Sequence, residues 1–174
     1  MQKFEPILPK EVKISNLVTT ADLKQKINIK QLNDFPWGIY DQVSYNGICG
    51  YIKTPEMKGR ITVFGTGKII SIGSNNIEDS IDKLHLAKFY LVKKNLITDV
   101  DIEPIIRNIV ATVSLEKHLN LKKLKIKIPN STYEPEHFAG LRYKIENGPA
   151  LLLFSSGKVV IADRYYSLEI FDIM

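Results

Sequence analysis

The sequence contains a single cysteine, only three histidines and no long hydrophobic run. One cysteine, Cys49, excludes an internal disulfide and a thiolate metal cluster within the chain, so we expect it to be a packed small residue. No apolar stretch approaches the roughly 20 residues that a membrane-spanning helix requires. Residues 1–13 also lack the apolar core of a secretory signal. We therefore expect a protein that works inside the cell.

Residue groupings typical of catalysis or metal binding are also scarce. His85, His118 and His137 are far apart in the sequence and lack the spacing of metal ligands. The run 65–68, Gly-Thr-Gly-Lys, lacks the full spacing of a phosphate-binding loop, and Ile69 follows its lysine, so a hairpin turn explains it better. Neither paired carboxylates nor a nucleophile with a base can be identified. We expect no enzyme, no cofactor and no metal.

The composition is that of a globular protein with a small excess of positive charge. The 174 residues are 44% hydrophobic, which suffices for one substantial core or two small fused ones. The net charge of +5 is compatible with a polyanionic partner. The densest basic cluster fits a solvated face and a phosphate contact equally well; it comprises Lys122, Lys123, Lys125 and Lys127.

The chain repeats itself. The sequence Asn-Leu-Val-Thr-Thr-Ala at 16–21 is echoed by Asn-Ile-Val-Ala-Thr-Val at 108–113, and the echo continues without a gap to Leu32 and Leu124. Farther on, the segment 63–70 matches the segment 153–160. A repeat of this length is a domain-sized unit, so we expect two similar units related by a pseudo-twofold axis.

Each unit is predicted to begin with a strand and a short helix and to continue with further strands. Period-two and period-3.6 patterns distinguish the two kinds of element. The expected strands are 14–21, 45–54, 60–64 and 69–72 in the first unit and 106–113, 138–145, 150–154 and 159–162 in the second; the expected short helices are 23–32 and 115–124.

A longer helix is expected at 78–95, where Ser74, Asn75 and Asn76 offer capping side chains. Its apolar stripe runs through Ile77, Ile81, Leu84, Lys88 and Leu91. The acidic segment 97–105 is interpreted as the linker between the units. The predicted domains are therefore 12–97 and 106–174.

Three motifs of the second unit occur in an order that resembles the core domain of the TATA-box-binding protein family. They are the segments 108–113, 133–141 (Tyr-Glu-Pro-Glu-His-Phe-Ala-Gly-Leu) and 151–160 (Leu-Leu-Leu-Phe-Ser-Ser-Gly-Lys-Val-Val), and the similarity extends over roughly 12–174. The resemblance implies an α+β saddle made of two pseudo-symmetric repeats. A curved antiparallel sheet would meet the minor groove of AT-rich DNA with one face and carry helices on the other.

The resemblance also assigns DNA-binding roles to individual residues. Asn16 and Asn108 would donate hydrogen bonds to base edges, because the minor groove of A·T pairs offers mainly acceptors. The assigned apolar and neutral contacts on the groove floor are Val18, Thr62, Ile70, Val110, Leu152 and Val160. Lys68, Lys144 and Lys158 would lie near phosphates.

Four aromatic residues correspond to the wedges that kink DNA in this family. They are Tyr45 and Phe64 in the first unit and Phe138 and Phe154 in the second. A lone Phe is ordinarily a core residue, but Phe64 and Phe154 both precede the same Gly-Lys turn. The Tyr45 hydroxyl would be desolvated inside the base stack, so we expect the weaker kink in the first unit.

The chain departs from the family pattern at several positions. Tyr51 replaces a basic residue, and Ile72 and Ala162 replace base-contacting threonines, which lowers the expected selectivity for TATA sequences. Only 167–174 can begin the last helix, which would be shortened and would leave part of the second unit's helix-covered face bare. Self-association or a partner helix is expected there.

A partner surface is implied at Glu134, Glu136 and His137, where the family docks a transcription factor IIB-like protein; a solvated turn is the alternative. The leading hypothesis is a transcription initiation factor that bends promoter DNA and recruits this partner and RNA polymerase. The alternative is a diverged paralogue that binds other transcription proteins without DNA, and a module of a nucleic-acid enzyme ranks last. The expected location is the nucleus of a eukaryote or the cytoplasm of an archaeon.

Overall fold

The computed structural model of the chain describes residues 11–163, apart from the side chains of Ser44 and Tyr45. Its elements are β1 (Val12–Asp22), η1 (Ile29–Asp34), β2 (Gly38–Ile39), η2 (Ser44–Gly47), β3 (Cys49–Ile52), β4 (Arg60–Phe64), β5 (Lys68–Ser74), α1 (Ile77–Lys93), β6 (Ile105–Ser114), α2 (Leu121–Lys127), β7 (Leu141–Lys144), β8 (Ala150–Leu153) and β9 (Lys158–Asp163). No helix among the described residues is long and apolar enough to cross a membrane.

The described residues form two compact units. The first unit consists of residues 16–108, and the second consists of residues 11–15 and 109–163. In the first unit the strands are antiparallel in the order β2-β3-β4-β5-β1. In the second unit the antiparallel order is β6-β9-β8-β7. The two long strands, β1 and β6, each contribute residues to both units.

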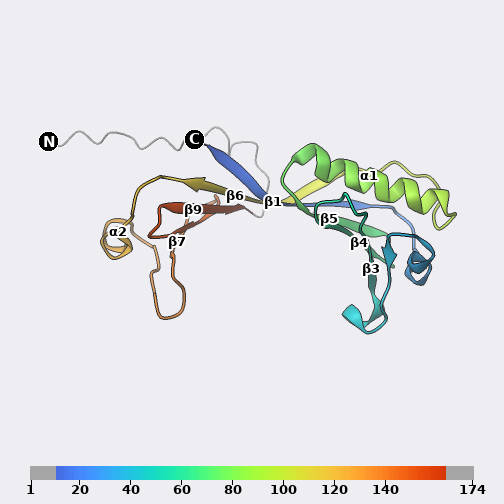
Figure 1. Cartoon of the computed structure of the whole chain (residues 1–174), viewed down its shortest axis with the longest axis horizontal. Helices are drawn as coiled ribbons and strands as arrows, with labels where there is room; N and C mark the ends of the chain where they lie inside the picture. Colours follow the sequence, from blue (N-terminus) through green and yellow to red (C-terminus); the bar gives the residue numbers. More distant parts are fainter. Residues whose placement is uncertain (1–10, 164–174) are drawn as a thin grey trace. The chain divides into compact units, whose positions relative to one another are not determined.

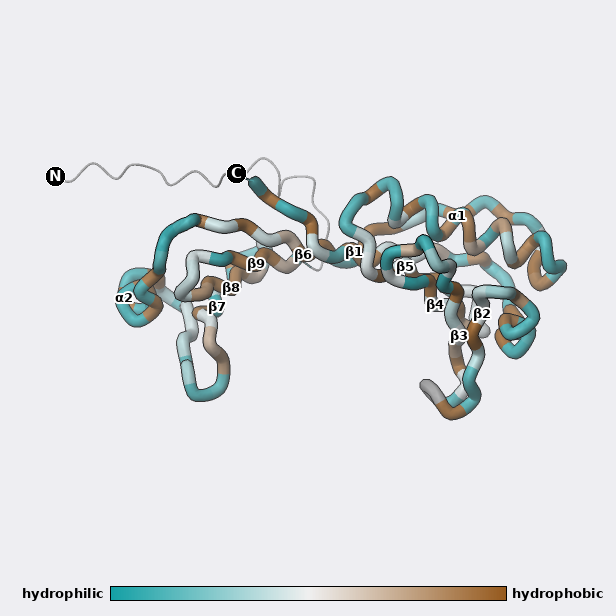
Figure 2. Tube along the Cα trace, viewed as in Figure 1, coloured by the Kyte–Doolittle hydropathy of each residue, from teal (hydrophilic) through white to brown (hydrophobic). Residues whose placement is uncertain are grey.

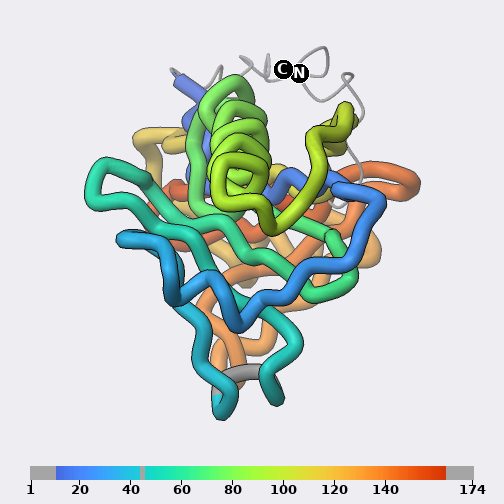
Figure 3. The backbone as a smooth tube through the Cα atoms, turned by 90° about the vertical axis from the view of Figure 1, so that its right-hand side faces the viewer, coloured from blue at the N-terminus to red at the C-terminus, as the bar shows by residue number. Residues whose placement is uncertain are grey.

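Helix α1 covers one face of the first unit's sheet (Figures 1 and 3). The Asn76 side chain caps it by accepting hydrogen bonds from the N–H groups of Glu78 and Asp79, as predicted. Hydrophilic and hydrophobic residues alternate along the helix (Figure 2), and its apolar contacts are made by Leu84, Ala87 and Leu91. The predicted stripe is therefore only partly correct.

Polar groups also lie in the contact between α1 and the sheet. The Ser80 hydroxyl lies 2.7 Å from the Thr19 hydroxyl and 3.2 Å from that of Ser71, and all three side chains are buried. The ammonium of Lys83, a residue that is 5% exposed, donates to the Lys58 carbonyl, the Ser74 hydroxyl and the Asp79 carboxylate. These bonds satisfy the buried groups and fix the helix on the sheet.

The pKa of Asp79 is lowered by this arrangement. Burial opposes the charged carboxylate and raises the pKa, but hydrogen bonds from Lys83 and Ser74 and the positive charge of Lys83 together outweigh it. The pKa of Asp99 is lowered as well, chiefly by its hydrogen bond and ion pair with Lys88 at 2.8 Å.

The repeat in the sequence reappears as matched backbone bonds. In the first unit the N–H groups of Leu23 and Ile27 donate to the carbonyls of Gly67 and Gly65. In the second unit the corresponding bonds run from Leu115 to Gly157 and from Leu119 to Ser155. Gly67 and Gly157 both have positive φ, and a Cβ on either would meet a backbone carbonyl oxygen at 2.1 to 2.3 Å.

The same bonds explain why the predicted helices 23–32 and 115–124 are wrong in extent. In the first unit the backbone of 23–28 is hydrogen-bonded to the hairpin, so only the 3₁₀ turn η1 forms in place of the predicted helix. In the second unit only α2 forms. Residues 45–47 lie in η2 rather than in the strand predicted for 45–54.

The segment 97–105, interpreted as the linker between the units, packs on the first unit. Ile97 and Ile102 are buried in the core of the first unit, and the Gln25 side chain bonds to Thr98. Cys49 is buried, as predicted. The C-terminal helix predicted at 167–174 lies outside the described residues.

Candidate nucleic-acid interface

The first unit's sheet has an open face opposite α1. Side chains alternate along β1, so that Leu17, Thr19 and Ala21 lie under the helix and Asn16 and Val18 point to the other side. The residues on this other side are half-buried. A face of this kind can contact a ligand without disturbing the core.

Strand register aligns the side chains of this open face in rows. The strands of the second unit carry equivalent rows, and we call the face on which they lie the second unit's open face. We call the rows that contain Thr20 and Thr112 the middle rows. The row in the first unit is Thr20, Ile70, Thr62 and Tyr51, and that in the second is Thr112, Val160, Leu152 and Arg142. The predicted contacts Thr62, Ile70, Leu152 and Val160 therefore occupy equivalent positions in the two units.

A second pair of rows contains the predicted contacts Val18 and Val110. Val18 is followed by Ile72 and Arg60, and Val110 by Ala162, Ala150 and Lys144. Each row thus ends in a cation. Because these rows hold Ile72 and Ala162, they also lack a side-chain hydroxyl.

The Asn16 amide has a defined orientation. Its Oδ1 accepts a hydrogen bond of 3.1 Å from the N–H of Gly73, where the register between β1 and β5 shifts. A backbone N–H can only donate, so the oxygen must face Gly73 and the amide nitrogen is left with its two donors. Asn108 is half-buried on β6.

Phe138 and Phe154 form an aromatic pair in the second unit. The ring centroids are 5.8 Å apart at an interplanar angle of 64°, and both residues are half-buried. Gly140 makes room for them, since a Cβ there would lie 2.7 Å from the Phe138 ring and 3.2 Å from the Phe154 ring. The rings are thus packed against each other while remaining accessible.

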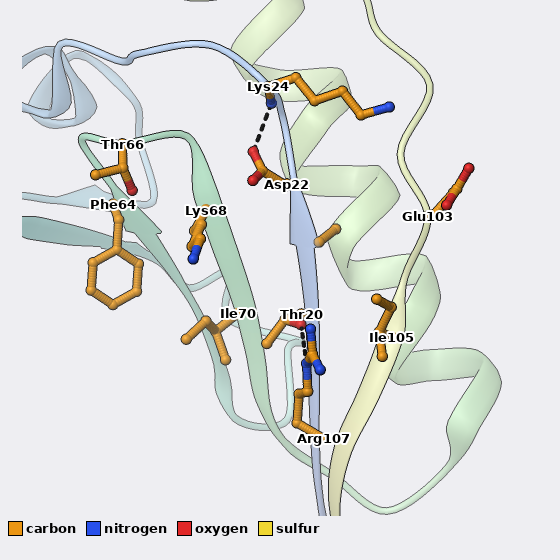
Figure 4. Close-up of a pocket in the computed structure, with 11 residues that line it drawn as sticks. Thr20, Asp22, Lys24, Phe64, Thr66, Lys68, Ile70, Glu103, Ile105 and Arg107 are labelled. Carbon is orange, nitrogen blue, oxygen red and sulfur yellow. Dashed lines mark hydrogen bonds between the residues drawn. The ribbon is translucent and has the colours of Figure 1, made fainter. Parts of the chain in front are cut away.

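Phe64 lies at a hollow of about 510 Å³ in the first unit. Figure 4 shows it with Lys68, Ile70 and Arg107 around this hollow, where the Arg107 Nε donates to the Thr20 hydroxyl. The second unit has a hollow of about 440 Å³ lined by the equivalent residues Thr112 and Lys158 and by Lys13. Lys13 and Arg107 were not among the predicted contacts.

The cations of the open face include two that the sequence analysis missed. The Arg60 guanidinium lies 4.4 Å from the Tyr51 ring centroid, and the Arg142 guanidinium lies 4.4 Å from that of Phe138. Lys144, which was predicted to contact phosphate, donates to the Gly148 carbonyl. Lys68 and Lys158 are exposed. The signal for Arg142 was available, because residues 142 and 144 share one face of a strand.

The predicted partner-binding residues lie in one surface turn. The Glu134 carbonyl accepts hydrogen bonds from the N–H groups of His137 and Phe138, and Glu134, Glu136 and His137 are exposed. Paired backbone bonds between Thr132 and Arg142 close this loop. The backbone of Tyr45 lies in η2, and its side chain is outside the described part of the structure.

No three His, Cys, Asp or Glu side chains among residues 11–163 are grouped so as to hold a metal ion. The open faces instead combine amide donors, apolar rows, aromatic rings and cations, which together suit a polyanion with an apolar groove.

Comparison with known proteins gives a consistent result. The family model described as "Transcription factor TFIID (or TATA-binding protein, TBP)" matches residues 11–90 and 103–164. The TATA-box-binding protein of Cenarchaeum symbiosum is 40% identical over 150 residues, covering 86% of this chain and 82% of the relative. That of Methanosphaera stadtmanae is 34% identical over 152 residues, covering 86% and 82%.

A solved structure, Methanococcus jannaschii TBP, is similar with a TM-score of 0.77 and 26% identity, covering 94% of this chain and 93% of that one. The predicted α+β fold is thereby confirmed.

Proposed function

Because this chain belongs to the TATA-box-binding protein family, whose members are DNA-binding transcription factors and not enzymes, we propose that it initiates transcription by gripping AT-rich promoter DNA in the minor groove and bending it. The observation that supports this best is that both units carry an equivalent open face. Equivalent rows of half-buried apolar side chains end in cations in both units.

The chemistry of this face suits the minor groove. A·T pairs present acceptors there, and the Asn16 amide keeps two donors after its oxygen has bound Gly73. Val18, Ile70, Val110, Leu152 and Val160 would cover the groove floor, with Thr62 and Asn108 beside them. A G·C pair would place its amino group against these donors and apolar groups.

Bending would come from the aromatic residues. Unstacking a base step costs a few kcal/mol, which is repaid when the bent groove meets more protein surface. Phe138 and Phe154 are accessible as a pair, so we propose that the second unit makes the stronger kink. In the first unit this role would fall to Phe64 and Tyr45.

Phosphate contacts would come from Lys68, Lys144 and Lys158. The positions of Arg60 and Arg142 on the open faces support adding these two arginines to the phosphate contacts. Each contact releases counterions, so affinity should fall with salt. The lack of hydroxyls at Ile72 and Ala162 removes hydrogen bonds to bases. We therefore propose that this chain prefers TATA sequences less strongly than a protein with threonine at these two positions would.

Fluorescence anisotropy with a labelled TATA-containing duplex at low salt tests the DNA-binding proposal. Absence of binding, or equal binding to a G·C-only duplex, would refute it. Bending is tested by energy transfer between the duplex ends with Phe138→Ala and Phe154→Ala. Phe89→Ala is the matched control, because Phe89 is 55% exposed and lies on α1, away from the open face.

We also propose that the turn with Glu134, Glu136 and His137 docks a transcription factor IIB-like protein, through which RNA polymerase is recruited. Exposed carboxylates on a closed loop offer a fixed target for a basic surface. Charge reversal of Glu134 and Glu136 to Arg should abolish capture of that protein on promoter DNA. Glu146→Arg, at another exposed turn, should leave it intact.

A second candidate function is a protein-interaction module or regulator with weak or no DNA binding. Ile72, Ala162 and Tyr51, which fill open-face positions without the expected hydroxyl or positive charge, favour it. Retention of a factor IIB-like partner in the absence of DNA, combined with no anisotropy change on duplex, would support this candidate over the first.

Three further proposals concern organisation. We propose repeat boundaries at 12–97 and 106–174. We propose self-association or a partner helix against the second unit, where all four residues of β8 are only half-buried; a monomer by light scattering at micromolar concentration would exclude self-association. The archaeal relatives favour the cytoplasm over a nucleus as the place of work.

A further inference from the structure

An arginine on β6 fixes the orientation of a threonine hydroxyl on the first unit's open face. The Arg107 Nε–H donates to the Thr20 hydroxyl oxygen at 3.1 Å, and both side chains line the hollow beside Phe64 (Figure 4). Arg107 belongs to the first unit although most of β6 belongs to the second. Neither Arg107 nor Thr20 was among the predicted DNA contacts.

The hydrogen bond decides where the Thr20 proton can point. A guanidinium can only donate, so the Thr20 oxygen accepts and its own proton is directed elsewhere. Ile70, the next residue of the middle row, has no side-chain acceptor. The carboxylates that line the hollow, those of Asp22 and Glu103, lie well apart from this hydroxyl (Figure 4). The Thr20 proton is therefore available to a ligand on the open face.

The second unit has the equivalent threonine without the arginine. Thr112 occupies the place of Thr20 in its middle row. Ser15 takes the place of Arg107, since each directly precedes the asparagine that begins its repeat motif. The Ser15 hydroxyl donates to the Val110 carbonyl at 3.0 Å and not to the threonine. Among residues 11–163, an arginine thus orients this threonine in the first unit alone.

We propose that Arg107 is a positioning residue that directs the Thr20 hydroxyl proton to base edges, and that the first unit thereby gains selectivity for A·T over G·C pairs. This inference rests on the proposed minor-groove function. An A·T pair offers acceptors at its minor-groove edge, which the Thr20 proton can meet. A G·C pair adds the guanine amino group, a donor that would face the hydroxyl proton.

The oriented hydroxyl lies close to a position where the first unit lacks one. Ile72 is the partner of Val18, two residues before Thr20 on β1, and brings no hydroxyl to its row. Thr62, the other threonine of the middle row, is only 6% exposed. Thr20 is half-buried and lines the hollow, so it is the more accessible threonine of this row.

Two substitutions of Arg107 separate its hydrogen bond from its charge. In glutamine the amide Nε2 is bonded to Cδ, as Nε is in arginine, so Arg107→Gln can still donate to Thr20. Arg107→Leu cannot donate, and both variants lack the positive charge. A phosphate contact by Arg107 would be lost equally in both. A difference in selectivity between them therefore reports on the hydrogen bond.

The experiment measures dissociation constants by fluorescence anisotropy for a TATA duplex and for duplexes that each carry one G·C pair in place of an A·T pair. Arg107→Leu and Thr20→Val should each lower the penalty for G·C about three- to tenfold, the value of one hydrogen bond, at the same base pair or its neighbour. Arg107→Gln and Thr20→Ser, which keep the donor and the hydroxyl, should retain the wild-type penalty. All four variants should unfold at the urea concentration of the wild type.

Inosine is the control on the DNA side. An I·C pair lacks the guanine amino group and presents acceptors alone, so the wild type should bind it as it binds A·T at the sensitive position. Thr112→Val is the matched control on the protein side. It removes the same hydroxyl from the equivalent row of the second unit, and it should leave the penalty at the sensitive position unchanged.

Three results would overturn the assignment. Equal selectivity in Arg107→Gln and Arg107→Leu would mean that Arg107 does not act through its hydrogen bond. Loss of selectivity in Arg107→Leu but not in Thr20→Val would mean that it does not act through Thr20. An I·C pair penalised as strongly as G·C would attribute the selectivity to duplex stiffness. In each case binding to the TATA duplex persists, whereas wild-type protein that fails to bind this duplex refutes the minor-groove proposal itself.

Discussion

Replacing Asn16 with Asp should separate the proposed DNA contact from folding at the open face. The substitution keeps the shape of the side chain, and Oδ1 still accepts from the Gly73 N–H at the same place. The second position changes from a nitrogen with two donors to a carboxylate oxygen, which would face the acceptors of A·T pairs. The stability of the folded protein should change little. The proposed complex with DNA would lose a hydrogen-bond donor and gain repulsion between the carboxylate and the base acceptors.

The magnitude follows from that geometry. A well-placed amide contact to bases is worth about 1–3 kcal/mol of binding free energy, and every 1.4 kcal/mol is a factor of ten. We therefore expect the dissociation constant for a TATA duplex to rise about 10- to 100-fold. The free energy of unfolding in urea should change by less than about 0.5 kcal/mol, as for other substitutions that leave packing and bonding intact.

Asn95→Asp is the control for charge. It adds the same negative charge at an exposed residue after α1, where the positive φ of 56° suits Asn and Asp alike. Anisotropy titrations of both variants at one salt concentration measure the difference. If Asn16→Asp and Asn95→Asp bind equally well, the amide donors of Asn16 do not contact DNA and the reasoning fails.

The other predictions concern the helix contact and a cation. Lys83→Met should lower the free energy of unfolding, measured in urea, by about 2–3 kcal/mol, since it removes three hydrogen bonds of a buried ammonium. Lys88→Met removes a more exposed ion pair and should lower the free energy of unfolding by less than about 1 kcal/mol. The pKa of Asp79 is lowered in the folded state, so the carboxylate contributes its full stabilisation above about pH 4. This contribution is lost as the pH falls through the lowered pKa. The difference in free energy of unfolding between the wild type and Asp79→Asn should therefore vanish in acid titrations. Arg142→Leu should weaken duplex binding and reduce the slope of log affinity against log salt by about one, and Lys93→Leu should change neither.

Sequence patterns predicted the parts of the fold that depend on local alternation and capping. The strand at 60–64 was predicted with the bounds that β4 has, and Asn76 caps α1. The repeat was visible because both units need the same Gly-containing turn, which admits no Cβ at Gly67 or Gly157. These features depend on neighbouring residues, so one sequence was enough to find them.

Features set by contacts between distant residues were not predictable in the same way. The extent of the first helix was wrong because residues 23–28 bond to the hairpin at 65–67, about 40 positions away. The buried Lys83 was missed because its three acceptors come from Lys58, Ser74 and Asp79. Burial of a lysine depends on such partners and not on its own helix position.

The cations of the candidate interface illustrate the same difficulty. The sequence analysis singled out Lys144 in the second unit, but strand register makes Arg142 the equivalent of Tyr51, because Tyr51 pairs with Thr62 and Arg142 pairs with Leu152. Arg60 can then supply the positive charge that Tyr51 lacks, by lying over its ring. Strand register depends on how strands pair across the sheet, and a single sequence gives only indirect information about this pairing.

The half-buried apolar rows are the strongest physical reason to regard the open faces as binding surfaces. Under α1, Ile61, Val63 and Ile69 are fully buried, so their hydrophobicity stabilises the fold. Val18, Ile70, Val110 and Val160 lie on the other side of the same strands or their equivalents, where they gain much less from folding. Strand propensity does not explain them, since threonine forms strands equally well and would be better solvated. Their apolar surface stabilises the protein only when another apolar surface covers it. The floor of a widened minor groove would cover it, and the surrounding cations would pair with the phosphates on either side of the groove.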